Sequence, residues 1–190
     1  MQTKNIMIVG VGGQGSLLAS KLLGHLLLTK GYDVKVSEVH GMSQRGGSVV
    51  TYVRYGDKVA SPIIDKGEAD FIVSFEPLEA ARWLSYLKKD GQIVTNIHGI
   101  DPMPVITGAA EYPENIVDRI KEKGVKTDAL DCLEIAQEAG SAKAVNVVLL
   151  GRLSHYFDFE ESEWMEALEA CVPAKFLEMN KKAFEMGAKA

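Results

Sequence analysis

Cysteine is scarce in this sequence, and its placement argues against the common thiolate sites. The chain holds two cysteines, Cys132 and Cys171, which lie far apart and form no C-x-x-C pair. This chain alone therefore cannot supply the four thiolates that an iron-sulfur cluster usually takes. The four histidines show no metal-ligand spacing, either among themselves or with the cysteines. We predict no metal site in this chain and two free thiols.

A basic block and a long apolar run are also missing. The 21 Lys and Arg residues are outnumbered by 26 Asp and Glu, and the formal net charge of -5 argues against a nucleic-acid partner. No charged-then-apolar leader is recognisable and no apolar run approaches bilayer-spanning length, so we expect a cytoplasmic protein without a membrane partner. With 190 residues, 46% of them hydrophobic, residues 1–190 are expected to form a single domain.

The sequence does contain a glycine cluster between an apolar run and a helical pattern. Residues 6–9 suit a strand buried on both faces, and residues 16–30 carry leucines at helical spacing. The G-x-G-x-x-G spacing between them allows a sharp strand-to-helix turn whose backbone amides face an anion, assisted by the helix dipole. The alternative is a glycine turn that serves packing alone. The candidate binding residues of this turn are Gly10, Gly12, Gly13, Gln14 and Gly15.

A second polar, glycine-rich stretch, residues 40–47, follows the strand expected over residues 32–40. Arg45 on this loop either presents its planar guanidinium to a phosphate, a carboxylate or another subunit, or is simply exposed to solvent. Glu38 either holds a ribose, as the acid of a dinucleotide-binding domain does, or orients the loop, for instance by pairing with Arg45. The candidate binding residues here are Glu38, Ser43, Gln44, Arg45, Gly46 and Gly47.

Strand and helix patterns alternate along the rest of the chain. Residues 48–55 and 58–63, separated by a Gly-Asp turn, predict an antiparallel hairpin. Further strands are expected at residues 69–75, 92–95, 105–106 and 125–130, and helices at residues 77–88, 114–123, 132–139, 143–156, 160–171 and 174–186. We therefore predict an α/β protein with three α/β/α layers, a mostly parallel Rossmann-like sheet, the inserted antiparallel hairpin and C-terminal helices.

Two motifs together give a more specific signal than the glycine spacing alone. Gly10-Val-Gly-Gly-Gln-Gly15, followed by Glu38-Val-His-Gly-Met-Ser-Gln-Arg-Gly-Gly-Ser-Val49, closely resembles the gamma subunit or domain of the 2-oxoacid:ferredoxin oxidoreductases. Within that family the chain is most similar to the small beta subunits of the indolepyruvate ferredoxin oxidoreductases. The resemblance covers essentially the full chain, although residues 96–113 offer nothing to match.

The resemblance implies a subunit of a thiamine-diphosphate enzyme that oxidatively decarboxylates a 2-oxoacid with coenzyme A. Electrons then pass through iron-sulfur clusters to ferredoxin. Because the chain has no Gly-Asp-Gly followed at the usual distance by Asn-Asn, the thiamine diphosphate, its magnesium and the clusters are expected on a larger partner subunit. The resemblance further implies that this chain completes the complex, with no catalytic residue of its own, and helps to bind coenzyme A through the glycine turn and Arg45.

Two other functions are compatible with the residues. A free-standing oxidoreductase domain that binds NAD or FAD is supported by the glycine spacing and Glu38, but the chain offers no second domain to bring a substrate to a nicotinamide. A noncatalytic interaction module would use the glycine turn for structure only and the final helices as a partner surface.

Overall fold

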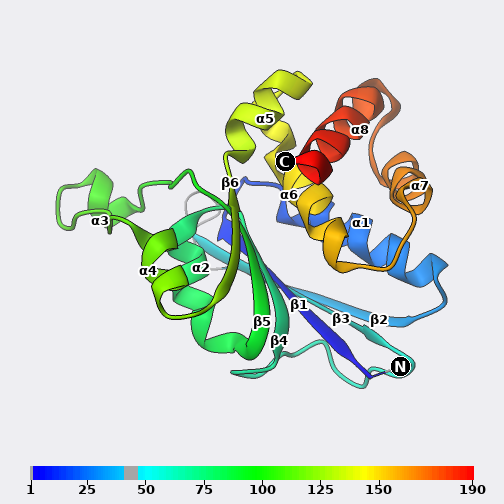
Figure 1. Cartoon of the computed structure of the whole chain (residues 1–190), viewed down its shortest axis with the longest axis horizontal. Helices are drawn as coiled ribbons and strands as arrows, with labels where there is room; N and C mark the ends of the chain where they lie inside the picture. The colour runs from blue at the N-terminus through cyan, green and yellow to red at the C-terminus, as the bar shows by residue number, and fades with distance from the viewer. Residues whose placement is uncertain (1, 41–46) are drawn as a thin grey trace.

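The computed structural model describes residues 2–40 and 47–190, and its centre is a six-stranded mixed sheet (Figure 1). The strands lie in the order β2-β3-β1-β4-β5-β6, and the pairs β1-β4, β4-β5 and β5-β6 are parallel. The predicted three-layer fold with a mostly parallel sheet is confirmed. The strands are β1 (Lys4–Val11), β2 (Asp33–His40), β3 (Ser48–Gly56), β4 (Ala69–Ser74), β5 (Leu87–Asn96) and β6 (Lys126–Leu130).

The antiparallel part of the sheet is made by β3, which lies between β1 and β2 and pairs with both. A hairpin is therefore present, but its strands are β2 and β3, and the prediction that residues 58–63 pair with β3 was wrong. Both edges of β3 are already occupied, and Pro62 lacks the backbone N–H that a strand pair needs. Arg54 instead donates from Nη1 to the carbonyls of Ser61 and Ile63, at 3.0 and 2.6 Å. A side chain of β3 therefore holds this segment, without backbone hydrogen bonds between two strands.

Helices cover both faces of the sheet, as Figure 1 shows. One face is covered by α1 and α6, against which α5, α7 and α8 pack, and the other face is covered by α2 and α4. The α-helices are α1 (Ser16–Thr29), α2 (Pro77–Trp83), α3 (Met103–Ile106), α4 (Ile116–Glu122), α5 (Cys132–Ala139), α6 (Val145–Leu153), α7 (Glu161–Cys171) and α8 (Ala174–Lys189). Three single 3-10 turns, η1 (Leu84–Tyr86), η2 (Ala142–Ala144) and η3 (Ser154–Tyr156), flank α2 and α6.

The apolar pattern of the sequence explains this layering. Residues 6–9 of β1 are fully buried because helices cover both of its faces. The α6 helix is buried along almost its whole length, since it lies between the sheet and α8. The two helices approach each other closely at two glycines. A Cβ on Gly151 would lie 2.1 Å from the Phe184 carbonyl oxygen, and a Cβ on Gly187 would lie 2.1 Å from the Val148 carbonyl oxygen.

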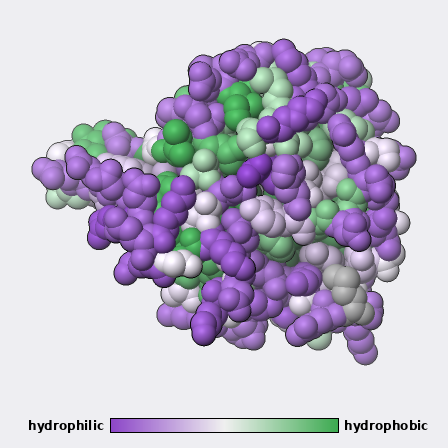
Figure 2. Space-filling view, viewed as in Figure 1, coloured by the Kyte–Doolittle hydropathy of each residue, from purple (hydrophilic) through white to green (hydrophobic). Residues whose placement is uncertain are grey.

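Two further segments differ from the sequence prediction. The helix expected over residues 77–88 ends at Trp83, and β5 begins at Leu87, so the Asp-Gly pair expected to precede this strand lies inside it. The short strand predicted at residues 105–106 is instead part of α3, which follows Pro102 and has Pro104 in its first turn, where a proline is tolerated. The arm that carries α3 exposes apolar side chains, among them Met103 and Ile106 (Figure 2). Across the described residues, no helix combines the length and apolar character needed to span a bilayer.

Candidate functional site

A cleft of about 700 Å³ opens at the carboxyl ends of the parallel strands. Its walls come from the glycine turn after β1, from the segment after β5 and from the first residues of α5 and α6. The connection after β1 leads towards β2 and β3, whereas the connection after β4 leads towards β5, so the strand order reverses between β1 and β4. Ligands of open α/β sheets bind at this kind of reversal. The lining residues that matter below are Gly13, Gly15, Asn96, His98, Lys143 and Asn146.

The glycine turn has the backbone conformation that its sequence requires. Gly13 and Gly15 adopt φ values of 99° and 89°, which residues with a Cβ rarely take. A Cβ on Gly10 would lie 2.6 Å from Gln14 Oε1 and 3.0 Å from the Phe75 ring, so a larger residue there would displace the Gln14 side chain. The amide of Gly12 donates to the carbonyl of Gly47 at 3.0 Å, which joins the turn to the end of the second glycine-rich stretch.

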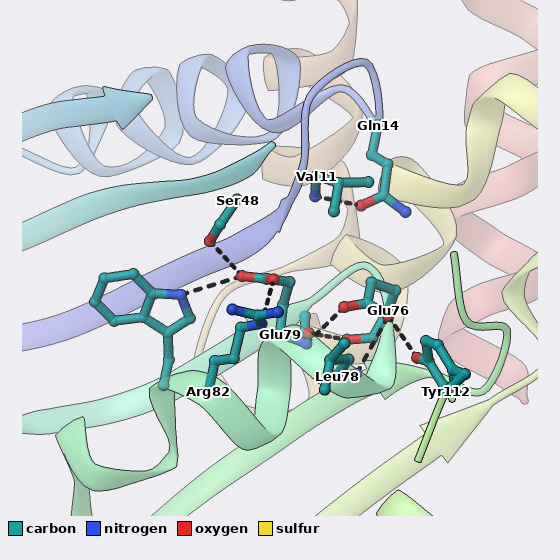
Figure 3. Close-up of polar contacts among 10 residues, drawn as sticks. Val11, Gln14, Ser48, Glu76, Leu78, Glu79, Arg82 and Tyr112 are labelled. Atoms are coloured by element: carbon teal, nitrogen blue, oxygen red, sulfur yellow. Dashed lines mark hydrogen bonds and ion pairs between the residues drawn. The ribbon is translucent and has the colours of Figure 1, made fainter. Parts of the chain in front are cut away.

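Gln14 closes the turn with its own side chain (Figure 3). Its Oε1 accepts from the Val11 amide at 2.8 Å, and its Nε2 donates to the Phe75 carbonyl at 3.2 Å. The Phe75 carbonyl also accepts from Asn96 Nδ2 at 3.3 Å, while Asn96 Oδ1 accepts from the Cys132 amide at 3.1 Å. These side-chain amides link the ends of β1, β4 and β5 to the start of α5. Gln14 therefore has a structural role, although it also lines the cleft.

Asn146 supports the turn from the opposite wall. It is 3% exposed, and its Nδ2 donates to the Gly15 carbonyl at 3.1 Å. A Cβ on Gly15 would lie 2.5 Å from that nitrogen, so the close approach of α6 depends on glycine at this position. An isolated polar residue in an apolar helix is the sequence feature that points to such a contact.

Three helices begin at the cleft, and their first amides give it positive potential. Gly15, the residue before α1, has no side chain with which to cap the helix. The start of α5 is capped by Asp131, which accepts from the Glu134 amide at 2.9 Å. The position of Asp131 directly before the helix pattern predicts this cap. His98 Nε2 lies 2.8 Å from the same Asp131 oxygen. The Glu134 amide, followed by His98, holds the pKa of Asp131 below its ordinary value.

A buried acidic cluster beside the reversal point was not found from the sequence. Glu76 and Glu79 are 1% and 3% exposed and lie around the start of α2 (Figure 3). Glu76 accepts from Tyr112 Oη at 2.6 Å and from the Glu79 amide at 2.6 Å, which fixes the start of α2. Glu79 accepts from Ser48 Oγ at 2.5 Å and pairs with Arg82 at 3.1 Å, while burial raises the pKa of Glu79. The position of Glu76 immediately before Pro77 was the available signal for a helix cap.

Glu38 is not among the residues that line the cleft. Its Oε2 accepts from Thr51 Oγ1 at 2.9 Å and from Ser16 Oγ at 3.2 Å, so it joins β2 and β3 to the start of α1. Contact of Glu38 with a ribose stays a prediction. The loop candidates Ser43, Gln44, Arg45 and Gly46 lie outside the described residues, and so does a pairing of Glu38 with Arg45. Within the described part of the chain, no group of three or more His, Cys, Asp or Glu residues could hold a metal ion.

Comparison with known proteins identifies the family of this chain. A family model described as pyruvate ferredoxin/flavodoxin oxidoreductase matches residues 5–190. The chain belongs to this family. It is 47% identical to indolepyruvate oxidoreductase subunit IorB of Thermococcus kodakarensis over 195 residues, which covers 100% of this chain and 96% of the relative. The resemblance to the gamma-type subunits of this oxidoreductase family, predicted from the two motifs, is thereby confirmed.

Solved structures of the family share the fold at low sequence identity. The pyruvate oxidoreductase subunit PORC of Thermotoga maritima has a TM-score of 0.75 at 19% identity, covering 100% of this chain and 97% of that one. The 2-oxoglutarate:ferredoxin oxidoreductase of Magnetococcus marinus, solved with 2-oxoglutarate, coenzyme A and succinyl-CoA bound, has a TM-score of 0.74 at 21% identity. The match covers 100% of this chain but 31% of that one, so the same fold occurs there as part of a larger polypeptide.

Proposed function

We propose that this chain is the small subunit of an indolepyruvate ferredoxin oxidoreductase. The observation that carries the proposal is the 47% identity to an IorB subunit over the whole chain. The enzyme would oxidatively decarboxylate an aryl 2-oxoacid in the presence of coenzyme A and deliver the electrons to ferredoxin. The thiamine diphosphate, magnesium and iron-sulfur clusters would lie on a larger partner subunit, because the sequence has no Gly-Asp-Gly and Asn-Asn pair and too few cysteines for a cluster.

We further propose that the cleft binds the nucleotide part of coenzyme A. The glycine turn suits a phosphate, because a Cβ on Gly13 would meet nothing within 4 Å and the first amides of α1 follow directly. No carboxylate is among the described residues that line the cleft. Its volume of about 700 Å³ lies within the usual range for ligand sites, roughly 300–1,000 Å³. Gly10 and Gln14 would shape the turn, while Gly12, Gly13 and Gly15 would bring backbone to the ligand.

The second glycine-rich stretch would complete the site or contact the partner. Gly47 accepts from the Gly12 amide, so the end of this stretch lies against the turn. We propose that Arg45, with Ser43, Gln44 and Gly46 beside it, contacts coenzyme A or the larger subunit. Arg45→Ala should then raise the KM for coenzyme A or weaken assembly, whereas Arg119→Ala on the opposite face of the sheet should do neither. If Arg45→Ala leaves the kinetics unchanged and the complex intact, the proposed role of Arg45 is wrong.

The first experiment measures activity with and without the partner. The purified chain, the candidate large subunit and their mixture are each assayed for indolepyruvate-dependent reduction of a low-potential dye in the presence of coenzyme A. We expect activity in the mixture only, together with a stable mixed complex by size-exclusion chromatography. Inactivity of a mixture whose large subunit is folded and loaded with its cofactors would contradict the proposal. Saturable 1:1 binding of NADH or FAD to the chain would favour the free-standing dinucleotide enzyme instead.

A further inference from the structure

The cleft is lined by basic side chains in an acidic protein. The whole chain has 26 Asp and Glu residues against 21 Lys and Arg. Of the described side chains that line the cleft, Lys143 and His98 are the basic ones, and none is acidic. Lys143 is exposed in η2, just before α6, and His98 is exposed in the segment after β5. The cleft therefore has basic side chains as well as the backbone amides of the glycine turn.

Coenzyme A has two kinds of phosphate that differ in charge. Each phosphorus of the pyrophosphate is a diester that carries about one negative charge, whereas the 3′-phosphate on the ribose is a monoester that carries roughly 1.5 to 2 near pH 7. A monoanion suits neutral backbone donors and a helix N-terminus. A dianion gains most from charge-assisted hydrogen bonds with cationic side chains. The two sets of donors in the cleft match these two kinds of group.

We propose that Lys143 and His98 bind the 3′-phosphate of coenzyme A, while the glycine turn binds the pyrophosphate. This inference rests on the proposed function and goes further, because it makes Lys143 and His98 the residues that distinguish coenzyme A from its dephospho form. A flexible ammonium and an imidazole that line the same cleft would both contact a terminal phosphate bound there. Loss of either side chain would then weaken the binding only of a ligand that carries the 3′-phosphate.

The contacts of His98 support this role. Asp131 Oδ1 lies 2.8 Å from His98 Nε2, which fixes the ring and leaves Nδ1 as its other polar atom. The Asp131 carboxylate also accepts from the Glu134 amide, so part of its negative charge is taken up by the start of α5. Asp131 does not line the cleft, although its neighbour Leu133 does.

The test measures binding of coenzyme A and of dephospho-coenzyme A to the reconstituted complex by titration calorimetry. Wild type, Lys143→Gln and His98→Gln are compared with Lys66→Gln, whose residue is exposed just before β4, at the amino ends of the parallel strands and so away from the cleft. We expect wild type to bind coenzyme A about tenfold more tightly than the dephospho form. Lys143→Gln should lose most of the preference for coenzyme A, and His98→Gln should lose part of it. The affinity of both variants for dephospho-coenzyme A should stay within about twofold of wild type. Lys66→Gln should behave as wild type.

Other results of this titration would contradict the proposal in distinguishable ways. Equal affinity of wild type for the two ligands, or equal weakening of both by Lys143→Gln, would overturn the assignment of the 3′-phosphate and leave coenzyme A binding by the cleft intact. If neither ligand binds the active wild-type complex, the proposed coenzyme A site fails and this inference fails with it. Circular dichroism melts and size-exclusion profiles that match wild type would show that a variant has lost a ligand contact and not its fold.

Discussion

The side chain of Asn146 donates a hydrogen bond to the carbonyl of Gly15, a residue 131 positions earlier in the chain, at 3.1 Å. The contact fixes the start of α6 against the glycine turn, and the Asn146 Oδ1 also accepts from the Val147 amide at 3.0 Å. A single buried amide therefore joins two walls of the cleft. Because Gly15 precedes α1, its carbonyl also accepts the first helical hydrogen bond, from Ala19 at 3.2 Å.

Replacing Asn146 by alanine should weaken both stability and ligand binding. Loss of two hydrogen bonds at a buried site should lower the free energy of unfolding by about 1–2 kcal/mol, measured by urea denaturation. Because the glycine turn loses its support, coenzyme A affinity of the complex should also fall. Asn180→Ala is the matched control, since that buried amide donates to Phe176 within α8, away from the cleft. It should reduce stability alone, and a similar loss of affinity in both variants would contradict a specific role for Asn146.

The crossing of α6 and α8 should tolerate no side chain at its centre. In Gly151→Ala the new Cβ would lie 2.1 Å from the Phe184 carbonyl oxygen and 2.9 Å from the Ala188 nitrogen, so the helices must move apart. We expect a loss of about 2–4 kcal/mol in the free energy of unfolding. Gly24→Ala in α1 is the control, because its Cβ would meet only Val36, at 3.8 Å.

This control should gain about 0.5–1 kcal/mol, since alanine is the better helix former and the conformation at Gly24 suits it. Both values come from the same urea titration. Equal stability of the two variants would mean that the α6-α8 contact adjusts without cost.

The sequence predicted the parts of the fold that depend on local pattern. The run at residues 6–9, the leucines of α1 and the Asp131 cap of α5 each follow from spacing within a few residues. The partner of β3 could not be read in this way, because a strand with apolar residues on both faces pairs wherever two edges are available. Those edges are occupied by β1, which is distant in sequence, and by β2, the strand that precedes β3.

The candidate site was predicted in part for the same reason. The glycine turn is a local motif and was identified, but the opposite wall comes from residues more than 80 positions away, such as Asn96 and Lys143. Nothing in the sequence near these residues shows that they share a cleft. Their roles depend on the parallel order of β1, β4, β5 and β6, which places the ends of these strands together.

Thiol chemistry should distinguish the two cysteines. Cys132 is fully buried, and burial raises the pKa of its thiol well above the ordinary value, so the reactive thiolate is scarce at pH 8. Cys171 is 8% exposed, and its pKa is also raised by burial. We expect native Cys171→Ser, which keeps Cys132, to react with a disulfide reagent only as fast as the protein unfolds. Cys132→Ser should react sooner, and rapid reaction of native Cys171→Ser would contradict the packing around Cys132.

Asp128 should contribute stability that disappears in acid. Burial alone would raise the pKa of Asp128, but hydrogen bonds from Arg152, at 2.7 and 3.0 Å, and from Tyr156 Oη, at 2.7 Å, outweigh it and hold this pKa below its ordinary value. A depressed carboxyl pKa means that the unfolded chain takes up the proton first as the pH falls. The contribution is therefore fully present above about pH 5 and is lost as the pH falls through 4 and below.

Comparison of wild type with Asp128→Asn by urea unfolding measures this contribution. At pH 7 the variant should be less stable by about 1–2 kcal/mol, because the Arg152 guanidinium loses its charged acceptor. At pH 3 the difference should shrink, since proton uptake at Asp128 in the unfolded wild type then offsets the stabilisation of its folded state. Asp65→Asn, at an exposed position before β4, should match wild type at both pH values. A difference between wild type and Asp128→Asn that is constant from pH 7 to pH 3 would show that shape and neutral hydrogen bonds at this site matter, and not the carboxylate charge.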